Sequence, residues 1–271
     1  MSNKHNPRRI IQISDTHCYA DDTSPLAWSA LTVYPNRSLQ RVLAHLRDQA
    51  ESFELLVISG DIVQEETAEA YQRVQQILQD FPTPIYLIPG NHDVPELLLS
   101  HLVTPTTGIH WQEQLSLGHW DLQLLNTHLS GHADGHLSAQ QLEAIATQLE
   151  LSNRHAQHTL LFMHHHPAPF GSGWMDQSGL QQSAAFLSLV QQHATVKAIA
   201  FGHIHHELHQ RLPGGAQVEL QLFGTPATCV QLSHDESRLG YAHSRPAWRE
   251  LLLHDNGRID STVFYLDEPL E

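Results

Sequence analysis

The chain has 271 residues, of which 41% are hydrophobic and 16% are charged, a balance typical of a globular protein with a sizeable core. Its formal net charge of -15 argues against nucleic acid as a partner, because proteins bind that polyanion mainly through Lys and Arg, and also against docking on anionic membranes. Two cysteines argue against a disulfide framework, whereas the 23 histidines are an unusually high number.

The first nine residues, MSNKHNPRR, lead directly into a strand-like run and contain no apolar core of a secretory signal. No apolar run in the sequence approaches the roughly 20 residues that a membrane-spanning helix needs. We therefore expect a soluble cytoplasmic protein.

Apolar runs and amphipathic segments alternate along the first three quarters of the chain. Short apolar runs typical of buried strands span residues 9–14, 54–59, 84–89, 121–126, 159–163 and 197–201. Helical periodicity covers residues 38–49, 67–81 and 138–151, and Ser138 and Gln141 have the spacing of a capping box. Strands that alternate with helices predict a largely parallel sheet covered by helices.

After Phe201 the pattern changes to strands joined by turns. The sequences PGG at residues 213–215 and DNG at residues 255–257 are typical of turns between antiparallel strands. We therefore predict a single α/β domain over residues 1–271, with a βα-rich part at residues 9–206 and a β-rich part at residues 207–271.

Metal-binding or acid–base side chains follow almost every predicted strand. Ligands of open α/β sheets bind beyond the carboxyl ends of the strands. The residues at those ends are Asp15-Thr16-His17, Gly60-Asp61, Gly90-Asn91-His92-Asp93, Asn126-Thr127-His128, His164-His165-His166 and Gly202-His203-Ile204-His205. Each motif alone is weak, because turns and surface histidines are common. The ordered set, each member after its own strand, predicts a metal centre.

The residue types and their spacing suit two metal ions. Asp15 and His17 are two residues apart, so on an extended segment both side chains leave the same face and reach one ion. Asp61 follows Gly60, whose backbone bends tightly and allows a carboxylate to stand between two ions. Asn91 adds a neutral amide oxygen, which limits the negative charge at a site for a phosphate. Such mixed nitrogen and oxygen sets favour Mn, Fe, Zn or Co over Mg or Ca alone, and two ions about 3.5–4 Å apart clamp a phosphoryl group.

The order of the motifs, D-x-H, G-D, G-N-H-D, H-H-x-P and G-H-x-H over residues 10–230, resembles the calcineurin-like metallophosphoesterases. The resemblance implies an α/β fold, a four-layer αββα sandwich of two mixed sheets packed face to face with helices outside. It implies that one ion is held by Asp15, His17, Asp61 and His205, and the other by Asp61, Asn91, His164 and His203.

The same resemblance implies the groups that handle the substrate. His92 would be the general acid or a phosphate-binding group beside the metals, and Asp93 would orient it. Six residues would surround the substrate phosphate: His17, Asp61, Asn91, His92, His164 and His205.

The three consecutive histidines raise a question of register. Adjacent side chains of an extended chain point to opposite faces, so all three cannot share one role. The H-H-x-P pattern of the family falls on His164, His165 and Pro167. The resemblance therefore implies that His164 is the ligand, and we expect His165 to point the opposite way. His166 occupies a position where many relatives have another proline.

Three segments narrow the resemblance to the bacterial class III branch, the cyclic 3′,5′-AMP phosphodiesterases: residues 171–180, 224–232 and 246–257. This branch implies hydrolysis of cyclic AMP to 5′-AMP by a metal-activated hydroxide, with His92 protonating the departing ribose oxygen. It also implies two metal ions per chain, with iron or manganese favoured over zinc or cobalt. The sequence departs from the family pattern at Cys18 and at Asn126. Neither is a metal position, so the departures put in doubt how neighbouring residues tune the ligands, not the ligands themselves.

Other functions are weaker hypotheses. A broader phosphodiesterase that acts on 2′,3′-cyclic nucleotides or glycerophosphodiesters is the alternative within the same chemistry. The acidic charge disfavours a nuclease. A non-catalytic, histidine-rich metal-binding protein is disfavoured because the candidate ligands follow strands singly, and a decayed site is disfavoured by the complete ligand set. The sequence leaves open the native metals, the oligomeric state and the role of residues 19–36, which contain Trp28.

Overall fold

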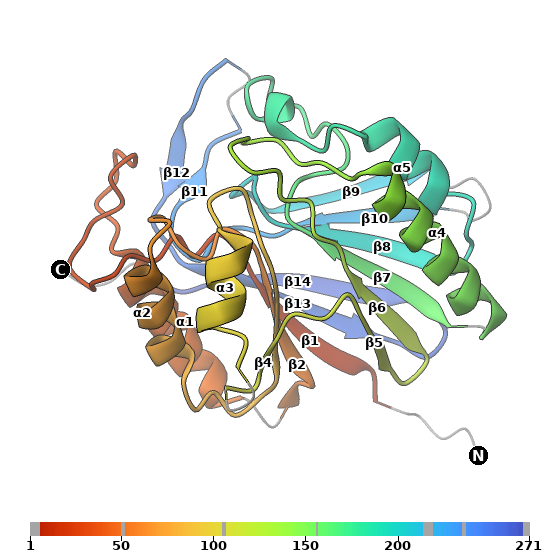
Figure 1. Cartoon of the computed structure of the whole chain (residues 1–271), viewed down its shortest axis with the longest axis horizontal. Coiled ribbons are helices and arrows are strands. Elements are labelled where there is room, and N and C mark those ends of the chain that lie inside the picture. The colour runs from red at the N-terminus through yellow and green to blue at the C-terminus, as the bar shows by residue number, and fades with distance from the viewer. Residues whose placement is uncertain are drawn as a thin grey trace.

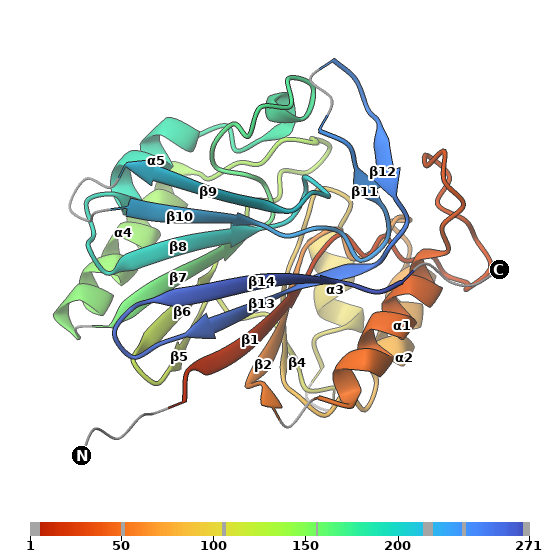
Figure 2. The same ribbon diagram turned by 180° about the vertical axis from the view of Figure 1, so that it is seen from behind.

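Two six-stranded sheets form the centre of the molecule, and helices cover their outer faces (Figure 1). The computed structural model describes residues 6–49, 52–104, 107–155, 157–213, 219–234 and 237–267. Seen from behind, β14, β13, β1 and β2 follow one another across one sheet, and β9, β10 and β8 lie in the other (Figure 2).

The first sheet has the strand order β14-β13-β1-β2-β3-β4. Strands β1 to β4 are parallel, whereas β13 is antiparallel to β1 and β14 is antiparallel to β13. The bounds are Arg8–Ile13 for β1, Leu55–Ser59 for β2, Ile85–Ile88 for β3, Ile109–His110 for β4, Ala247–Leu253 for β13 and Ile259–Tyr265 for β14.

The second sheet has the order β5-β6-β7-β8-β10-β9. Strands β6, β7, β8 and β10 are parallel, and β5 and β9 pair antiparallel at the two edges. The bounds are Gln114–Leu117 for β5, Trp120–Leu124 for β6, His158–Met163 for β7, Val196–Phe201 for β8, Leu208–Pro213 for β9 and Glu219–Gly224 for β10. A small sheet pairs β11 (Gln231–Leu232) with β12 (Tyr241–His243).

Apolar side chains fill three interfaces between four layers. Residues of both sheets, among them Leu55 and Phe162, form the core between the sheets. The helices on the first sheet are α1 (Pro35–Arg47), α2 (Ala68–Leu78) and α3 (Pro95–His101), and those on the second are α4 (Ala139–Arg154) and α5 (Ser183–Val190). A 3₁₀-helix spans Met175–Ser178. The four-layer αββα prediction is therefore confirmed.

All six predicted strands are present, each within two residues of its expected ends, and the three predicted helices end within three residues of theirs. The capping box is confirmed: the Gln141 amide N–H donates to Ser138 Oγ over 3.2 Å, and the Ser138 N–H donates to Gln141 Oε1 over 2.9 Å. Both C-terminal pairs, β9 with β10 and β13 with β14, are antiparallel as expected. The PGG sequence of the first pair lies mostly outside the described residues.

Strands from the C-terminal part of the chain complete both sheets, since β9 and β10 join the second and β13 and β14 join the first. None of the helices in the described parts of the chain is long and apolar enough to cross a membrane.

Candidate metal centre

The loops that follow the parallel strands of both sheets meet in one place. The Asp15 N–H donates to the Gly60 carbonyl over 3.0 Å, which joins the loops after β1 and β2. The Gly202 N–H donates to the His164 carbonyl over 3.1 Å, which joins the loops after β7 and β8. The His203 N–H donates to the Asp15 carboxylate over 3.0 Å and so ties the second sheet to the first.

The four residues predicted for one ion lie together. His17 Nε2 and His205 Nε2 are 3.2 Å apart, and His205 Nε2 is 3.3 Å from Asp15 Oδ1. Asp61 Oδ2 is 3.7 Å from His17 Nε2. All four side chains are buried. The four residues that the resemblance assigns to one ion therefore lie next to one another, and their role as ligands stays a prediction.

The residues predicted for the other ion lie on the opposite side of Asp61. His164 Nε2 is 3.2 Å from Asn91 Oδ1 and 3.4 Å from Asp61 Oδ1. The His203 ring centre lies 5.0 Å from that of His164. Asp61 thus presents Oδ2 to the first group and Oδ1 to the second, which is the geometry a bridging carboxylate needs.

Carbonyl oxygens fix the orientation of two of these histidines. His164 Nδ1 donates to the Ser59 carbonyl, and His205 Nδ1 donates to the Val230 carbonyl, each over 2.8 Å. Because a carbonyl only accepts, the proton of each neutral ring is on Nδ1, and Nε2 keeps its lone pair for a metal.

Strained backbone is concentrated at these residues. Among the described residues other than glycine, six have positive φ angles, and Asp80 is the only one of the six outside the predicted ligand set. The other five are Asp15, His17, Asp61, His203 and His205. Left-handed backbone in such side chains costs free energy and is typical of functional sites. Gly60, with φ of 94°, precedes Asp61, and a Cβ there would overlap the His164 ring.

The charges of the site fit bound cations. Burial opposes ionisation of Asp61, but the charges of His164, His92 and His17 and the hydrogen bond from His164 together hold the pKa of the carboxyl well below 3.8. Burial likewise opposes protonation of His205, yet Asp15 raises its pKa well above 6.5, and Asp61 raises that of His164 to about 9. Burial lowers the pKa of His17 to about 3. The buried carboxylates thus require positive charge beside them, and two metal ions among these nitrogen and oxygen donors would supply it.

His92 lies at the mouth of this group, but Asp93 does not orient it. The Asp93 carboxylate accepts hydrogen bonds from the N–H groups of Ile62 and Gly90 and from the Tyr71 hydroxyl. Its role is therefore to clamp the loops after β2 and β3, and the prediction that it orients His92 is wrong.

Gln64 contacts His92 instead. The Trp28 indole N–H, which can only donate, donates to Gln64 Oε1 over 2.8 Å, so the amide nitrogen of Gln64 faces away from Trp28. That nitrogen lies 3.5 Å from His92 Nδ1. Sequence reasoning missed Gln64, although it stands only three residues after Asp61.

The triplet of histidines is packed more closely than alternation predicts. His164 lies among the predicted ligands. His165 does not point away from it: the two rings are 4.8 Å apart, and ring nitrogens of His164, His165 and His203 lie within 4.8 Å of one another. Strand β7 ends at Met163, so alternation does not extend into the following turn. His166 stacks on His203, and its Nε2 is 3.7 Å from Asp176 Oδ1.

The loop at residues 19–36 covers the first group. The Trp28 ring stands edge-on to His17 and to His205, with 5.7 Å between ring centres in each pair, and it stacks on Tyr241. A cavity of about 480 Å³ opens beside Asn91 and His92, and its other lining residues include His128, Ser130 and Glu66. The metal centre thus has a covered side and an open side.

Comparisons with known proteins agree with this geometry. The family model described as calcineurin-like phosphoesterase matches residues 8–207. A protein of Vibrio vulnificus named 3′,5′-cyclic adenosine monophosphate phosphodiesterase CpdA is 34% identical over 259 residues, 95% of this chain and 90% of the relative. The protein of that name from Haemophilus influenzae is 32% identical, over 94% of this chain and 89% of its own.

Among solved structures, a dimetal phosphatase from Danio rerio matches with a TM-score of 0.69 and 14% sequence identity, covering 92% of this chain and 94% of its own. At that identity the match supports the fold, and the two buried donor groups on either side of Asp61 support a site for two metal ions. The chain therefore belongs to the calcineurin-like phosphoesterase family.

Proposed function

We propose that this protein is a metal-dependent phosphodiesterase that hydrolyses 3′,5′-cyclic AMP to 5′-AMP. The observation that carries the proposal is the similarity to the cyclic AMP phosphodiesterase of Vibrio vulnificus, which extends over 95% of this chain. The arrangement of donors around Asp61 supports the same reaction class, because it provides a place for two ions beside an open cavity.

The proposed ligands are the two sets that flank Asp61: Asp15, His17, Asp61 and His205 for one ion, and Asp61, Asn91, His164 and His203 for the other. When bound, two ions of this kind polarise the phosphate and lower the pKa of the attacking water. The proposed ligands supply carboxylate, amide and imidazole donors, a set that favours transition metals. We propose that the bound ions are iron or manganese, with zinc and cobalt as the next candidates.

His92 is the proposed general acid. The Gln64 amide N–H faces His92 Nδ1, so Nε2 is the ring nitrogen that would hold a proton toward the substrate. That proton would pass to the ribose O3′ as the P–O3′ bond breaks, while the oxygen of water forms the new bond to phosphorus. The proton that the water gives up would leave to solvent, from which His92 regains its own. The His92 backbone N–H donates to Asp61 Oδ1 over 2.9 Å, which keeps the acid next to the bridging carboxylate.

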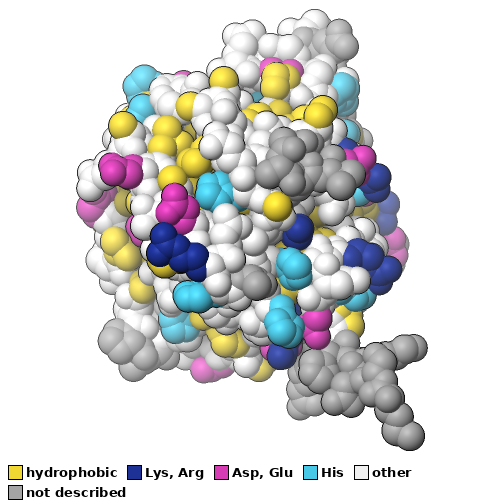
Figure 3. Space-filling model, turned by 90° about the vertical axis from the view of Figure 1, so that its right-hand side faces the viewer, with side chains coloured by type: hydrophobic (Ala, Val, Ile, Leu, Met, Phe, Trp, Pro, Cys, Tyr) yellow, Lys and Arg dark blue, Asp and Glu magenta, His cyan; other side chains and the backbone are white. Residues whose placement is uncertain are grey.

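The cavity beside Asn91 and His92 is the proposed place for the nucleoside. Its volume of about 480 Å³ lies within the range of about 300–1,000 Å³ that is usual for small-molecule sites. On the face shown in Figure 3, Lys and Arg side chains are spread among acidic and histidine side chains rather than gathered in a stripe. Both features suit a small anionic substrate better than a long polyanion.

A substrate panel tests this proposal. The protein is stripped of metal, reconstituted separately with Fe, Mn, Zn, Co or Mg, and assayed on 3′,5′-cyclic AMP, 2′,3′-cyclic AMP, glycerophosphodiesters, phosphopeptides and DNA. We expect 5′-AMP from 3′,5′-cyclic AMP with the highest kcat/KM of the panel. A higher kcat/KM on 2′,3′-cyclic AMP or on glycerophosphodiesters would replace the proposal by the broader phosphodiesterase, and inactivity with every metal would refute it.

A further inference from the structure

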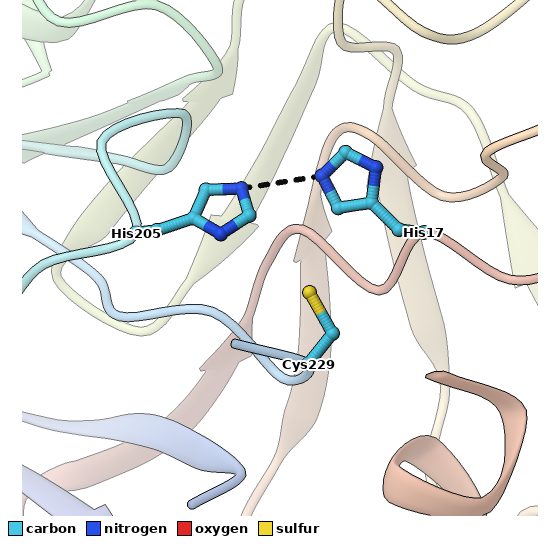
Figure 4. A group of neighbouring side chains, drawn as sticks. All are labelled: His17, His205 and Cys229. Carbon is cyan, nitrogen blue, oxygen red and sulfur yellow. Dashed lines mark hydrogen bonds between the residues drawn. The ribbon is translucent and has the colours of Figure 1, made fainter. Parts of the chain in front are cut away.

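A cysteine thiol lies next to the first group of proposed ligands. Cys229 is completely buried, and its Sγ lies within 4.8 Å of ring nitrogens of both His17 and His205. Figure 4 shows the two rings facing one another, with the thiol directed toward the space between them. Among the groups of described residues capable of holding an ion, this is the one that contains sulfur.

The position of Cys229 in the fold follows the same rule as the proposed ligands. It lies in the loop after the carboxyl end of β10, a strand parallel to β8 in the second sheet. Loops after parallel strands of the two sheets supply every proposed ligand, and the loop after β10 is a further one that the sequence pattern did not identify.

Hydrogen bonds on both sides of Cys229 hold this loop against the metal centre. The Thr228 N–H donates to the Ser14 carbonyl over 2.8 Å, next to Asp15. The Val230 carbonyl accepts the Nδ1–H of His205 over 2.8 Å. The residue before Cys229 is therefore fixed to one ligand loop and the residue after it to a ligand side chain, so the thiol is held in place.

We propose that the Cys229 thiolate is an additional ligand of the ion held by Asp15, His17, Asp61 and His205, an inference that rests on the two-metal site of the proposed function. Bonds of about 2.0–2.3 Å to nitrogen and sulfur place two ligand atoms of one ion at most about 4.4 Å apart, so a small side-chain adjustment suffices. On binding, the S–H bond breaks, sulfur keeps the electron pair for the metal, and the proton leaves to solvent. A soft thiolate favours Fe, Zn or Co over Mn or Mg at this position.

The sequence contains a matched control, because its only other cysteine is Cys18. Cys18 is also completely buried and follows His17 directly. Its Sγ lies 3.9 Å from the Thr16 carbonyl oxygen. Its side chain packs in the core between the first sheet and the helices that cover it. Cys18 is absent from the metal-capable groups that the described residues form.

Spectroscopy of the cobalt-loaded full chain tests the inference without relying on activity. Wild type, Cys18→Ser and Cys229→Ser are stripped, loaded with two equivalents of Co²⁺, and their near-ultraviolet absorption is recorded. We expect the sulfur-to-Co²⁺ charge-transfer band in wild type and in Cys18→Ser, and its loss in Cys229→Ser. Titration should show one of the two Co²⁺ sites weakened about 10–100-fold in Cys229→Ser and both unchanged in Cys18→Ser.

The Cys18→Ser spectrum tests the thiolate assignment even if Cys229→Ser fails to fold. In Cys18→Ser, Cys229 is the sole thiol of the chain. A band in that variant supports the assignment, and two bound Co²⁺ ions without a band overturn it. Failure of the proposed function has a different signature: wild type would bind fewer than two Co²⁺ ions or would leave cyclic AMP intact. Two bound ions, activity and no charge-transfer band would refute the thiolate ligand alone.

Discussion

Asp61 presents one carboxylate oxygen to each half of the metal centre, Oδ2 to His17 and Oδ1 to His164. Its backbone has a φ of 49°, so the chain accepts strain to direct the side chain between the two groups. A substitution here should therefore affect both proposed sites, whereas a substitution of a terminal ligand should affect one.

We predict that Asp61→Ala weakens both metal sites and that His164→Ala weakens one. Elemental analysis after gel filtration should give fewer than one ion per chain for Asp61→Ala and about one for His164→Ala, against two for wild type. Circular dichroism serves as the folding control. If Asp61→Ala retained one ion at wild-type affinity, the carboxylate would not be a bridge.

A second prediction concerns the contact of Gln64 with His92. Gln64→Leu removes the amide that faces His92 Nδ1, so the ring loses the contact that selects its tautomer. With cyclic AMP, kcat should fall about 10-fold or more, while KM changes little, since removal of general acid catalysis costs about 10²–10⁴.

A p-nitrophenyl phosphodiester separates positioning from general damage, because its phenolate leaves without a proton. We expect Gln64→Leu and His92→Ala to impair its hydrolysis far less than that of cyclic AMP. Metal content should be that of wild type in both variants. Equal losses on the two substrates would show that Gln64 acts on the metals or on the fold.

The identities of the proposed ligands could be predicted from the sequence, but several side-chain directions could not. Asp15, Asp61 and His205 lie where the strand-end rule expects them. His165 does not point as alternation predicts, because it stands in the turn after β7, where the period of two no longer applies. The resemblance gave Asp93 the wrong partner, because its carboxylate accepts hydrogen bonds from the neighbouring loops instead. Gln64 belongs to no motif, and the segment at residues 224–232 that contains Cys229 indicated only the family branch. The packing of distant loops brings both side chains to the site.

Among the elements, α4 shows most directly how sequence sets local structure. Ser138 and Gln141 satisfy each other's backbone N–H groups at its first turn, as their spacing predicts. Gln141 also donates from its amide nitrogen to the Asn126 carbonyl over 2.9 Å, which fixes the helix to the loop after β6. The cap therefore stabilises the helix and one loop near the metal centre.

We predict that Ser138→Ala lowers the free energy of unfolding by about 1 kcal/mol, since it leaves the Gln141 N–H without its cap. Chemical denaturation followed by circular dichroism measures the change. The matched control is Gln140→Ala in the same turn, an exposed position at which we expect a change below about 0.5 kcal/mol. A similar loss in both variants would mean that the cap contributes nothing specific.

The central strands were predictable because each is a short apolar run, buried on both faces between helices and the opposite sheet. The missed elements are short or less regular: β4 has two residues, and α3 has seven and begins at Pro95. These short elements form because they pack against neighbouring elements. A few residues are too short a stretch to show a periodicity that would predict them.

At the scale of the whole molecule, the metal centre joins the two sheets. Asp15, Asp61 and Asn91 follow strands of the first sheet, whereas His164, His203 and His205 follow strands of the second. Ions bound between them would add a connection that the unfolded chain lacks.

We predict that removal of the metals lowers the thermal stability of the protein. At free metal concentrations 100 times Kd, each site contributes about 2.7 kcal/mol, which corresponds to several degrees in Tm for a chain of this size. Scanning calorimetry with and without chelator should show the loss, and added Co²⁺ or Mn²⁺ should reverse it. Asp61→Ala provides the control: a chelator effect of wild-type size in that variant would place the stabilising ions elsewhere.

Strand β1 lies between β2 and β13. In its antiparallel pairing with β13, Arg8 lies opposite Leu253. During synthesis β1 is made before β13, so one of its two edges must wait until the chain has been made as far as Leu253. At about 5–20 residues per second, that wait is roughly 12–50 s. Over this time the N–H and C=O groups along that edge of β1 lack the partner strand, and such unpaired edges in nascent chains favour aggregation and chaperone binding.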